Sequence, residues 1–446
     1  MTTKHDIVIY ADRLVTMNPK RDVIKNAVVG IQGDRISYIG TNEKIEATKT
    51  IRKNDSILIP GLINTHTHVP MTTMRGIADD FPLMKWLEHY IFPVEAKFAS
   101  EEFVYWGTKL AALELISSGT TTICDMFYYI GSIARACDES GIRALIAGDC
   151  SLAYLQHLNM EERLEKGLEL NQKYHEEFKK YKRVKNILGP HSAYSINEKY
   201  LKKISDLAIK NDMPISMHIA ETKDEKEIIE KKFGKKINTT VQYLYDIGFL
   251  EAKVLSVHTI WVNEDDQNIL AKKNVHVAHC PQSNLKIASG IAPIDHMLDK
   301  GIVVALGTDG PASNNDMILW EDMTLAAILH KGNRHNPTLI PAKKAFEMAT
   351  IDGAKALWME KEIGSIEVGK KADLVLVNAS SPHQMPNSEN VYSQLVYSTK
   401  SSDVQTVIID GNIVYEDRVY KTLDQTEIYT HAKKIRTDID QFLSTR

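Results

Sequence analysis

The sequence of 446 residues has only four cysteines, and no two of them form a C-x-x-C pair. This content argues against a scaffold built on disulfides and predicts free thiols in a reducing compartment. The sequence contains 54 Lys and Arg residues and 58 Asp and Glu residues, for a formal net charge of −4. Neither sign of charge is therefore in large excess. Without a basic surface, nucleic-acid binding has no electrostatic support, and no nucleic-acid partner is expected.

Long apolar runs are absent as well. The longest, such as residues 301–307, fall far short of the roughly 20 residues that a membrane helix requires, so no membrane partner is expected. The first residues, MTTKHDIVIYADRL, carry charges where a signal peptide needs its apolar core. We therefore expect a cytoplasmic protein. No G-x-G-x-x-G sequence follows any predicted strand, and no internal repeat is present.

Short β-branched runs alternate with helical segments through the centre of the chain, which is typical of a parallel sheet with crossover helices. The eight runs are SILIPGLINTH (56–66), TTTICDMF (120–127), IRALIAGDC (142–150), VKNILGPHS (184–192), PISMHIAE (214–221), VLSVHTI (254–260), VHVAHCP (275–281) and IVVALGTDG (302–310). Eight strand–helix units over about 300 residues match an α/β fold of the (β/α)₈ TIM-like barrel type. A doubly wound open sheet is the alternative, but it usually has fewer strands.

The two ends of the chain are predicted to form further short strands. Residues 1–58 contain DIVIYADRLVTM and AVVGIQGDRISYIG, and residues 372–420 contain ADLVLVN, QLVYS and VQTVIIDGNIVYEDRVY, with a hairpin signal at Asp410-Gly411. Neither end has enough strands to bury a sheet face alone. We therefore predict a composite β-sandwich with a C-terminal helix, from residues 1–58 and 362–446, beside a barrel at residues 59–361.

Histidines collect at the carboxyl ends of the predicted strands. They are His66, His68, His191, His218, His258 and His279, and Asp309 ends the eighth strand. In a barrel all eight strand ends face one rim, where the active site is built. Histidines scattered over the surface or core would not favour strand ends so consistently. The sequence therefore predicts a functional cluster at this rim.

His66 and His68 lie on one face of a strand because side chains alternate with period two, which places their Cα atoms about 6.6–7 Å apart. That spacing lets two imidazoles share one metal ion. With His218 and Asp309, three imidazoles and a carboxylate suit one Zn²⁺, with Fe²⁺ as the alternative. A water in the remaining position would lose a proton near neutral pH. The fourth strand carries Lys185 at its start, so no bridging carboxylated lysine is expected and one metal is predicted.

Glu221 lies three residues after His218, where a carboxylate can sit beside the metal-bound water and carry protons without ligating. The alternative is an ordinary glutamate at a helix start, because ETKDEKEIIEKK is charged and helical in pattern. His258 ends an apolar strand, and its alignment with the other strand ends favours a group that polarises substrate or holds the hydroxide. The segment AHCPQSNLK offers Ser283 and Asn284, which can brace the rim.

The blocks around these residues resemble those of the amidohydrolase superfamily, and within it the 5-methylthioadenosine/S-adenosylhomocysteine deaminases. The resemblance covers almost the whole chain. Its motifs are PGLINTHTHVPMTTMRGIADDFPLMKWL, FPVEAKF, LGPHSAYS, MHIAET, HCPQSNLKIASGIAPI and LGTDGPASNNDMILWEDM. Related chlorohydrolases and guanine deaminases share several of these blocks.

The resemblance implies a metal-dependent hydrolase that converts an adenosine-type nucleoside to its inosine form and ammonia. The substrate would be 5′-methylthioadenosine, S-adenosylhomocysteine, adenosine or 5′-deoxyadenosine. Asp309 would be a metal ligand and a base toward the water, Glu221 would protonate the purine ring, and His258 would stabilise the attacking hydroxide. Glu221 and Asp309 would both also contact the substrate. The alternative is a guanine- or cytosine-type base deaminase, or a triazine chlorohydrolase, on the same metal site.

Further substrate contacts are implied only by the resemblance. Glu95 in FPVEAKF matches the position that binds ribose hydroxyls, His191 matches another substrate contact, and Arg163 resembles an arginine that faces the substrate tail. From the residues alone, Glu95 would begin a charged helix and touch only water. The loop at residues 149–163 lacks the second arginine that some relatives use, which weakens the case for S-adenosylhomocysteine. The resemblance also implies a homodimer or homotetramer.

Overall fold

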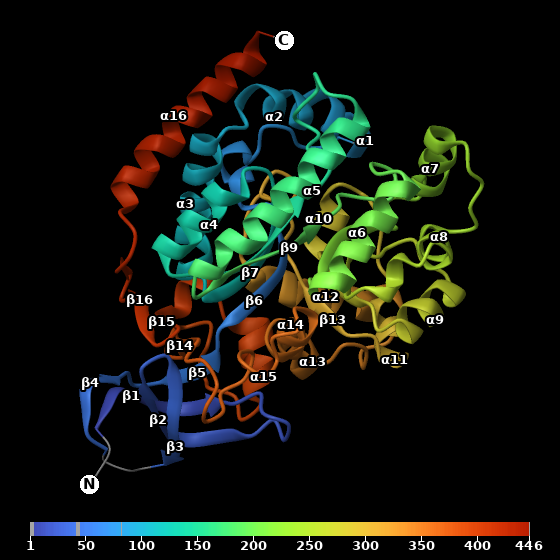
Figure 1. The fold of residues 1–446 in the computed structure, drawn as a ribbon. Helices are drawn as coiled ribbons and strands as arrows, with labels where there is room; N and C mark the ends of the chain where they lie inside the picture. Colours follow the sequence, from blue (N-terminus) through green and yellow to red (C-terminus); the bar gives the residue numbers. More distant parts are fainter. Residues whose placement is uncertain (1–3, 42–44, 82, 446) are drawn as a thin grey trace.

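Eight parallel strands form the centre of the molecule (Figure 1). A computed structural model describes residues 4–41, 45–81 and 83–445. The strands neighbour one another in chain order in a single sheet, and the predicted TIM-like barrel is confirmed. They are β6 (Leu62–Thr67), β7 (Thr120–Phe127), β8 (Arg143–Asp149), β9 (Val184–Gly189), β10 (Ile215–Ile219), β11 (Val254–His258), β12 (His276–His279) and β13 (Val304–Leu306).

The barrel closes between its first and last strands, beside the predicted metal site. The Asp309 N–H donates to the carbonyl of His66 at 3.0 Å, and the Thr65 hydroxyl donates to the carbonyl of Leu306 at 2.8 Å. An isolated parallel bridge pairs Thr67 with Asp309. Residues more than 240 positions apart in the sequence therefore meet through main-chain contacts.

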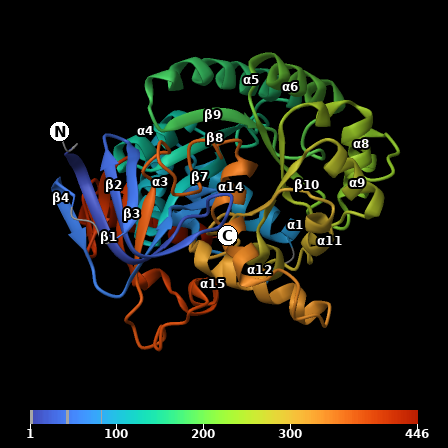
Figure 2. The ribbon, with the colours of Figure 1, turned by 90° about the horizontal axis from the view of Figure 1, so that it is seen from below.

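Helices surround the barrel strands, and the view from below shows the terminal strands standing to one side of this ring (Figure 2). The helices of the barrel region are α1 (Leu83–Trp86), α2 (Phe92–Phe98), α3 (Glu101–Ser117), α4 (Ile130–Ser140), α5 (Met160–Glu177), α6 (Glu198–Asn211), α7 (Glu225–Phe233), α8 (Thr240–Asp246), α9 (Glu264–Lys272), α10 (Pro281–Lys286), α11 (Ile294–Asp299), α12 (Leu319–Asn333), α13 (Ala342–Met348) and α14 (Ile351–Ala356). Shorter helical segments are η1 (Val69–Met74), η2 (Leu87–Ile91), η3 (Phe178–Lys180) and η4 (Phe249–Glu251). Among the described residues, no helix has both the length and the apolar content to span a membrane.

Local sequence explains where several of these helices start. Asn159 caps α5 by accepting the N–H of Glu162 at 3.0 Å, while the Glu162 carboxylate accepts the N–H of Asn159 at 2.9 Å. Asn263 and Asp266 form the same reciprocal pair at the start of α9. Such a capping box satisfies backbone donors that the helix itself leaves unpaired.

Strands from both ends of the chain form one mixed sheet of nine strands, with β5 and β14 joining the two ends. The predicted pairing of the termini is therefore confirmed. The sheet buries a core of its own, which includes Ile9, Val29, Leu58 and Leu376. Its strands are β1 (His5–Val15), β2 (Val23–Gln32), β3 (Arg35–Thr41), β4 (Ala47–Arg52), β5 (Ser56–Pro60), β14 (Leu374–Asn378), β15 (Val404–Ile409), β16 (Asn412–Glu416) and β17 (Val419–Tyr420).

The run SILIPGLINTH, expected as one strand, is divided at Gly61. Residues before the glycine form β5 in the terminal sheet, and residues after it form β6 in the barrel. A Cβ atom at Gly61 would lie 2.0 Å from the Thr121 hydroxyl oxygen, so only glycine allows the backbone this close to β7. The apolar pattern continues across the division because both strands are buried.

Residues 394–398, QLVYS, were expected as a strand and instead form the helical segment η5 (Gln394–Ser398), so that prediction was wrong. Asn390 accepts the N–H of Ser393 and starts the short helix α15 (Val391–Ser393) immediately before it. Val396 is buried, and its carbonyl accepts a hydrogen bond from Thr324 of α12 at 2.6 Å. The contact with the barrel helix α12 therefore explains why this segment is helical. A second short segment, η6 (Ser401–Asp403), leads into β15.

The boundaries of the two predicted domains stay a prediction, and residues 1–3, 42–44 and 446 of the terminal domain lie outside the described residues. The last helix, α16 (Gln425–Ser444), runs along the barrel helix α3 (Figure 1). There His431 stacks on Trp106 with ring centroids 3.7 Å apart. The terminal sheet is tied to the barrel by Arg143 of β8, whose guanidinium contacts both carboxylate oxygens of Asp373 at 2.9 and 3.0 Å.

Candidate active site

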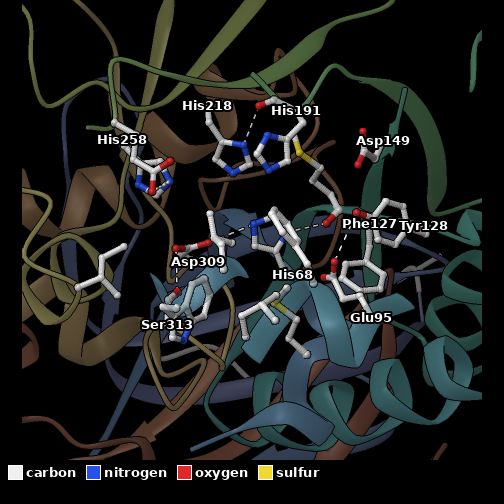
Figure 3. A pocket seen from close by; sticks show the side chains of 18 of the residues that line it. His68, Glu95, Phe127, Tyr128, Asp149, His191, His218, His258, Asp309 and Ser313 are labelled. Carbon is white, nitrogen blue, oxygen red and sulfur yellow. Dashed lines mark hydrogen bonds and ion pairs between the residues drawn. The ribbon is translucent and has the colours of Figure 1, made fainter. Parts of the chain in front are cut away.

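His66, His68, His218 and Asp309 converge at the carboxyl end of the barrel, and Figure 3 shows the last three of them. His66 Nε2 lies 3.3 Å from His218 Nε2 and 3.4 Å from Asp309 Oδ1. His68 Nε2 lies 3.2 Å from the same oxygen of Asp309. The structure therefore brings the four predicted ligands together: the ligand atoms of His66, His68 and His218 lie within 4.8 Å of one another, as do those of His66, His258 and Asp309.

The orientation of two imidazoles follows from their outer ring nitrogens. His68 Nδ1 lies 2.6 Å from the carbonyl of Met126, and His218 Nδ1 lies 2.8 Å from the carbonyl of His191. A carbonyl only accepts, so each Nδ1 carries a proton, and each Nε2 is the atom that can offer a lone pair to a metal at the centre. Lone pairs that face a carboxylate repel it unless a cation or proton lies between them. This donor set fits a divalent metal such as Zn²⁺.

Burial and mutual contacts set the pKa values of these side chains. Burial lowers the pKa of His66 to about 3 and that of His218 well below its usual range, which leaves both in the neutral form that binds metal. Burial acts against protonation of His68 too, but the hydrogen bond and charge of Asp309 raise its pKa to about 9. Burial would raise the pKa of Asp309, yet the two histidines hold it well below its usual range. The site thus keeps His66 and His218 neutral and Asp309 ionised.

Asp309 is held by its neighbours in an unusual backbone conformation. Its φ of 61° lies in the left-handed region, which costs energy for a residue other than glycine. The hydroxyls of Ser283 and Ser313 donate to Oδ2 at 2.6 and 2.9 Å, which leaves Oδ1 toward the histidines. Ser283 thus braces the rim, as the sequence suggested, and this support explains why the conformation persists.

Glu221 and His258 form a second pair beside the cluster. Glu221 Oε1 lies 3.8 Å from His258 Nε2, and both side chains are buried. His258 Nδ1 lies 2.8 Å from the amide oxygen of Asn284, so Nδ1 carries the proton and Nε2 faces Glu221. Burial raises the pKa of Glu221, as a group that exchanges protons near neutral pH requires. Asn284 therefore braces the rim through His258.

A second glutamate holds the turn that carries Glu221. Glu225 accepts the N–H of Ala220 through Oε1 and the N–H of Glu221 through Oε2, both at 3.0 Å, and its side chain is buried. Ala220 has φ of 53°, again in the left-handed region. Helix α7 begins only at Glu225, so Glu221 precedes the helix and is not a residue of its first turn. The Glu225 carboxylate therefore fixes a strained connection between β10 and α7.

Replacing Glu225 with Gln is expected to destabilise this turn, because an amide offers one acceptor oxygen for two backbone donors. A buried N–H without a partner costs about 1–3 kcal/mol. We expect at least about fivefold faster amide hydrogen exchange at Ala220 and Glu221, together with a lower Tm. The exposed Glu227, changed to Gln, is the matched control. Unchanged exchange at the two amides would contradict the role of Glu225.

A cavity extends from the cluster to Glu95 and Tyr128. Glu95 lies on α2, is only 5 % exposed and accepts a hydrogen bond from the Tyr128 hydroxyl at 3.5 Å. Burial raises the pKa of Glu95 to about 8. The interpretation that Glu95 touches only water is therefore wrong, because its carboxyl group lies in the cavity wall.

The other two residues expected to contact substrate are His191 and Arg163, and only the first of them lines the cavity. His191 lines the cavity beside His218, and burial lowers its pKa to about 4. Arg163 is in the first turn of α5, where Nη1 lies 3.5 Å from the carbonyl of Ala153. Its side chain is half-buried and does not line this cavity. The predicted contact of Arg163 with a substrate tail stays a prediction.

Sequence reasoning missed three residues of the site. Asp149 ends β8 and lines the cavity, so the strand-end rule that found the histidines applies to it as well. Ser313 supports Asp309 from four residues downstream, and Glu225 supports Glu221 from the same spacing. Nothing in the sequence distinguishes these last two from ordinary serines and helix-start glutamates.

Comparison with known proteins places this geometry in a family. The model of the amidohydrolase family matches residues 57–414, which include all four candidate ligands. The chain belongs to the amidohydrolase family. A protein named 5-methylthioadenosine/S-adenosylhomocysteine deaminase, from Thermoanaerobacter pseudethanolicus, is 41% identical over 94% of this chain and 96% of its own length.

Two further similar proteins have names that state an activity. A 5′-deoxyadenosine deaminase from Methanocaldococcus jannaschii is 43% identical over 93% of this chain and 98% of its own length. The crystal structure of an adenosine deaminase from Xanthomonas campestris with bound zinc is 30% identical and has a TM-score of 0.92, covering 99% of this chain and 100% of that one. The chain is similar to these proteins over more than nine-tenths of its length, and the predicted family resemblance is confirmed.

Proposed function

We propose that this amidohydrolase removes the 6-amino group of an adenosine-type nucleoside by hydrolysis, releasing ammonia and the inosine form. One observation carries the proposal: Glu221 and the buried Glu95 line the same cavity as the ligands His68, His218 and Asp309. The ligand cluster by itself suits many hydrolases, whereas a carboxyl group in the cavity wall adds a site for sugar hydroxyls. The names of the relatives, which are deaminases of adenosine derivatives, support the same substrate class.

A divalent metal held by His66, His68, His218 and Asp309 would make a bound water nucleophilic near neutral pH. We propose one zinc ion per chain, with Fe²⁺ as the alternative. The zinc in the similar adenosine deaminase supports this choice.

The chain's own residues would move the protons of the reaction. The Glu221 carboxyl group donates to the purine nitrogen beside C6, which makes that carbon more electrophilic. His258, with its Nδ1 proton held by Asn284, hydrogen-bonds the attacking oxygen through Nε2. Asp309 accepts a proton from the water, and Glu221 then carries a proton to the departing amine. Glu221, His258 and Asp309 are buried side chains that line one cavity.

We also propose that the enzyme works in the cytoplasm as a homodimer or homotetramer. The four cysteines, Cys124, Cys137, Cys150 and Cys280, are free and buried, which supports a reducing compartment. The oligomeric states are those that the family resemblance implies.

The decisive experiment is an ammonia-release assay with purified protein. The substrates are 5′-methylthioadenosine, S-adenosylhomocysteine, adenosine and 5′-deoxyadenosine on one side, and adenine, guanine and cytosine on the other. We expect a strong preference for nucleosides, because Glu95 loses its partners when the sugar is missing. Faster release from guanine or cytosine would overturn the proposal in favour of a base deaminase.

The Glu95→Ala variant tests the origin of this preference. Two hydrogen bonds to the ribose contribute about 0.5–1.5 kcal/mol each, and more when the carboxyl group is ionised, so kcat/KM for 5′-methylthioadenosine should fall about tenfold or more, while kcat/KM for adenine changes little. Glu88→Ala, which changes an exposed glutamate before α2, is the control. A nucleoside preference that survives in Glu95→Ala would contradict the role of this residue.

A further inference from the structure

Asp149 is a buried carboxylate in the cavity that the proposed reaction does not use. It lies at the carboxyl end of β8 and is 5 % exposed. The N–H of Ser151 donates to Oδ1 at 2.6 Å, and the Ser151 hydroxyl donates to Oδ2 at 2.9 Å. These two hydrogen bonds hold the carboxylate in one orientation and leave each oxygen free to accept another.

No cation pairs with this carboxylate. Among the residues that the structure describes, none forms an ion pair of 4 Å or less with Asp149. Burial raises its pKa to about 6, against the opposing influence of Ser151, His68 and Arg163. The group is therefore mainly ionised at neutral pH. A buried charge without a partner is costly, and such groups are normally paired.

Asp149 lies at the same end of the cavity as Glu95 and Tyr128. Figure 3 shows these three side chains on the side away from His258. The negative charge of Asp149 acts to raise the pKa of both Glu95 and Tyr128, after burial as the larger cause for each. Since Arg163 does not line the cavity, the lining at this end presents acidic groups and no basic side chain other than histidine.

We propose that Asp149 selects the charge of the 5′ substituent: the site accepts adenosine derivatives with an uncharged or cationic 5′ group and rejects those with an anionic one. This inference rests on the proposed function, because a ribose held by Glu95 directs its 5′ carbon beyond the sugar hydroxyls, away from the metal ligands. A 5′ ammonium group would supply the missing cation. A 5′ phosphate would meet the buried Asp149 carboxylate, and like charges in such an environment repel strongly.

The test compares three adenosine derivatives whose 5′ groups are neutral, cationic and anionic. They are 5′-deoxyadenosine, 5′-amino-5′-deoxyadenosine, whose amine is protonated at neutral pH, and adenosine 5′-phosphate. S-adenosylhomocysteine is not used in this test, because its tail carries both a positive and a negative charge and cannot separate their effects. The variant is Asp149→Asn, which keeps the shape of the side chain. Its amide oxygen can accept the Ser151 N–H and its amide nitrogen can donate to the Ser151 hydroxyl, so the local hydrogen bonds survive.

For the wild-type protein we expect kcat/KM for adenosine 5′-phosphate to be at least about tenfold below that for 5′-deoxyadenosine, and the amino derivative to be at least as good as 5′-deoxyadenosine. In Asp149→Asn, relative to 5′-deoxyadenosine, the phosphate should gain about tenfold or more and the amino derivative should lose about tenfold or more. Asp206→Asn, which removes an exposed carboxylate from α6, should change none of these ratios.

Several outcomes would overturn the inference. An equal loss for all three nucleosides in Asp149→Asn would assign the residue a structural role, and a wild-type enzyme that accepts the phosphate as readily as 5′-deoxyadenosine would exclude charge selection. Turnover of 5′-deoxyadenosine with no effect of the charge of the 5′ group would overturn this inference and leave the proposed function intact. Absence of ammonia from all three substrates with the wild-type protein would overturn the proposed function together with it.

Discussion

Glu221→Gln is expected to lower kcat by about 10²–10⁴-fold while leaving metal content and fold intact. The amide has nearly the shape of the carboxyl group but cannot carry a proton. Glu221 is buried 3.8 Å from His258, and its backbone N–H is held by Glu225. The variant side chain should therefore occupy the same position, so that the loss reports proton transfer and not misplacement.

The measurement combines kcat for ammonia release with metal analysis and Tm. Glu227→Gln is the matched control, since Glu227 is exposed six residues further along the chain. A loss below tenfold in kcat with Glu221→Gln would rule out the proton-carrying role. A large loss accompanied by loss of metal would instead show that Glu221 supports the metal site.

The double variant His66→Ala, His68→Ala is expected to lose the bound metal and essentially all turnover. Both imidazoles place Nε2 within 3.4 Å of the Asp309 carboxylate, so their removal leaves at most one imidazole and one carboxylate of the four ligands. Two remaining ligands do not hold a divalent metal in competition with water. The loss should exceed that of Glu221→Gln, because the nucleophile itself is no longer activated.

Elemental analysis checks this expectation directly. The wild-type protein should contain one transition-metal ion per chain, and the double variant should contain none above background. Replacement of the exposed His296 and His335 by alanine is the control and should preserve the metal. Two ions per wild-type chain, or a normal content in the double variant, would contradict the assignment of the ligands.

Much of the metal site could be predicted from the sequence, because in a barrel the ends of successive strands lie at known positions around one rim. Each of His66, His218 and Asp309 lies within three residues of the end of an apolar run. Parallel strands in a barrel all end at one rim. Groups that are distant in the chain must therefore meet there, and local pattern together with one topological rule is sufficient to predict the cluster.

The residues at the end of the cavity near Glu95, where the sugar is proposed to bind, could not be predicted from local sequence pattern. Glu95 and Arg163 both stand in charged helical sequence, yet Glu95 is buried in the cavity wall and Arg163 lies outside it. Burial of a helical carboxylate depends on which elements cover it, here the segment that carries Tyr128. Asp149 shares its strand-end position with the histidines, but its lack of a cationic partner is visible only when every neighbouring element is in place.

The eight-stranded barrel, the joining of the two ends of the chain and the candidate ligands could be predicted from the residues alone, because these depend on hydrophobic period and on residue type at strand ends. The division of SILIPGLINTH at Gly61 between two sheets and the helix at residues 394–398 could not be predicted in this way. Only the tertiary structure decided these two features and how Glu225 holds the turn before α7. The physical reason is the same in each case, since these features depend on contacts with distant segments, which a local pattern does not encode.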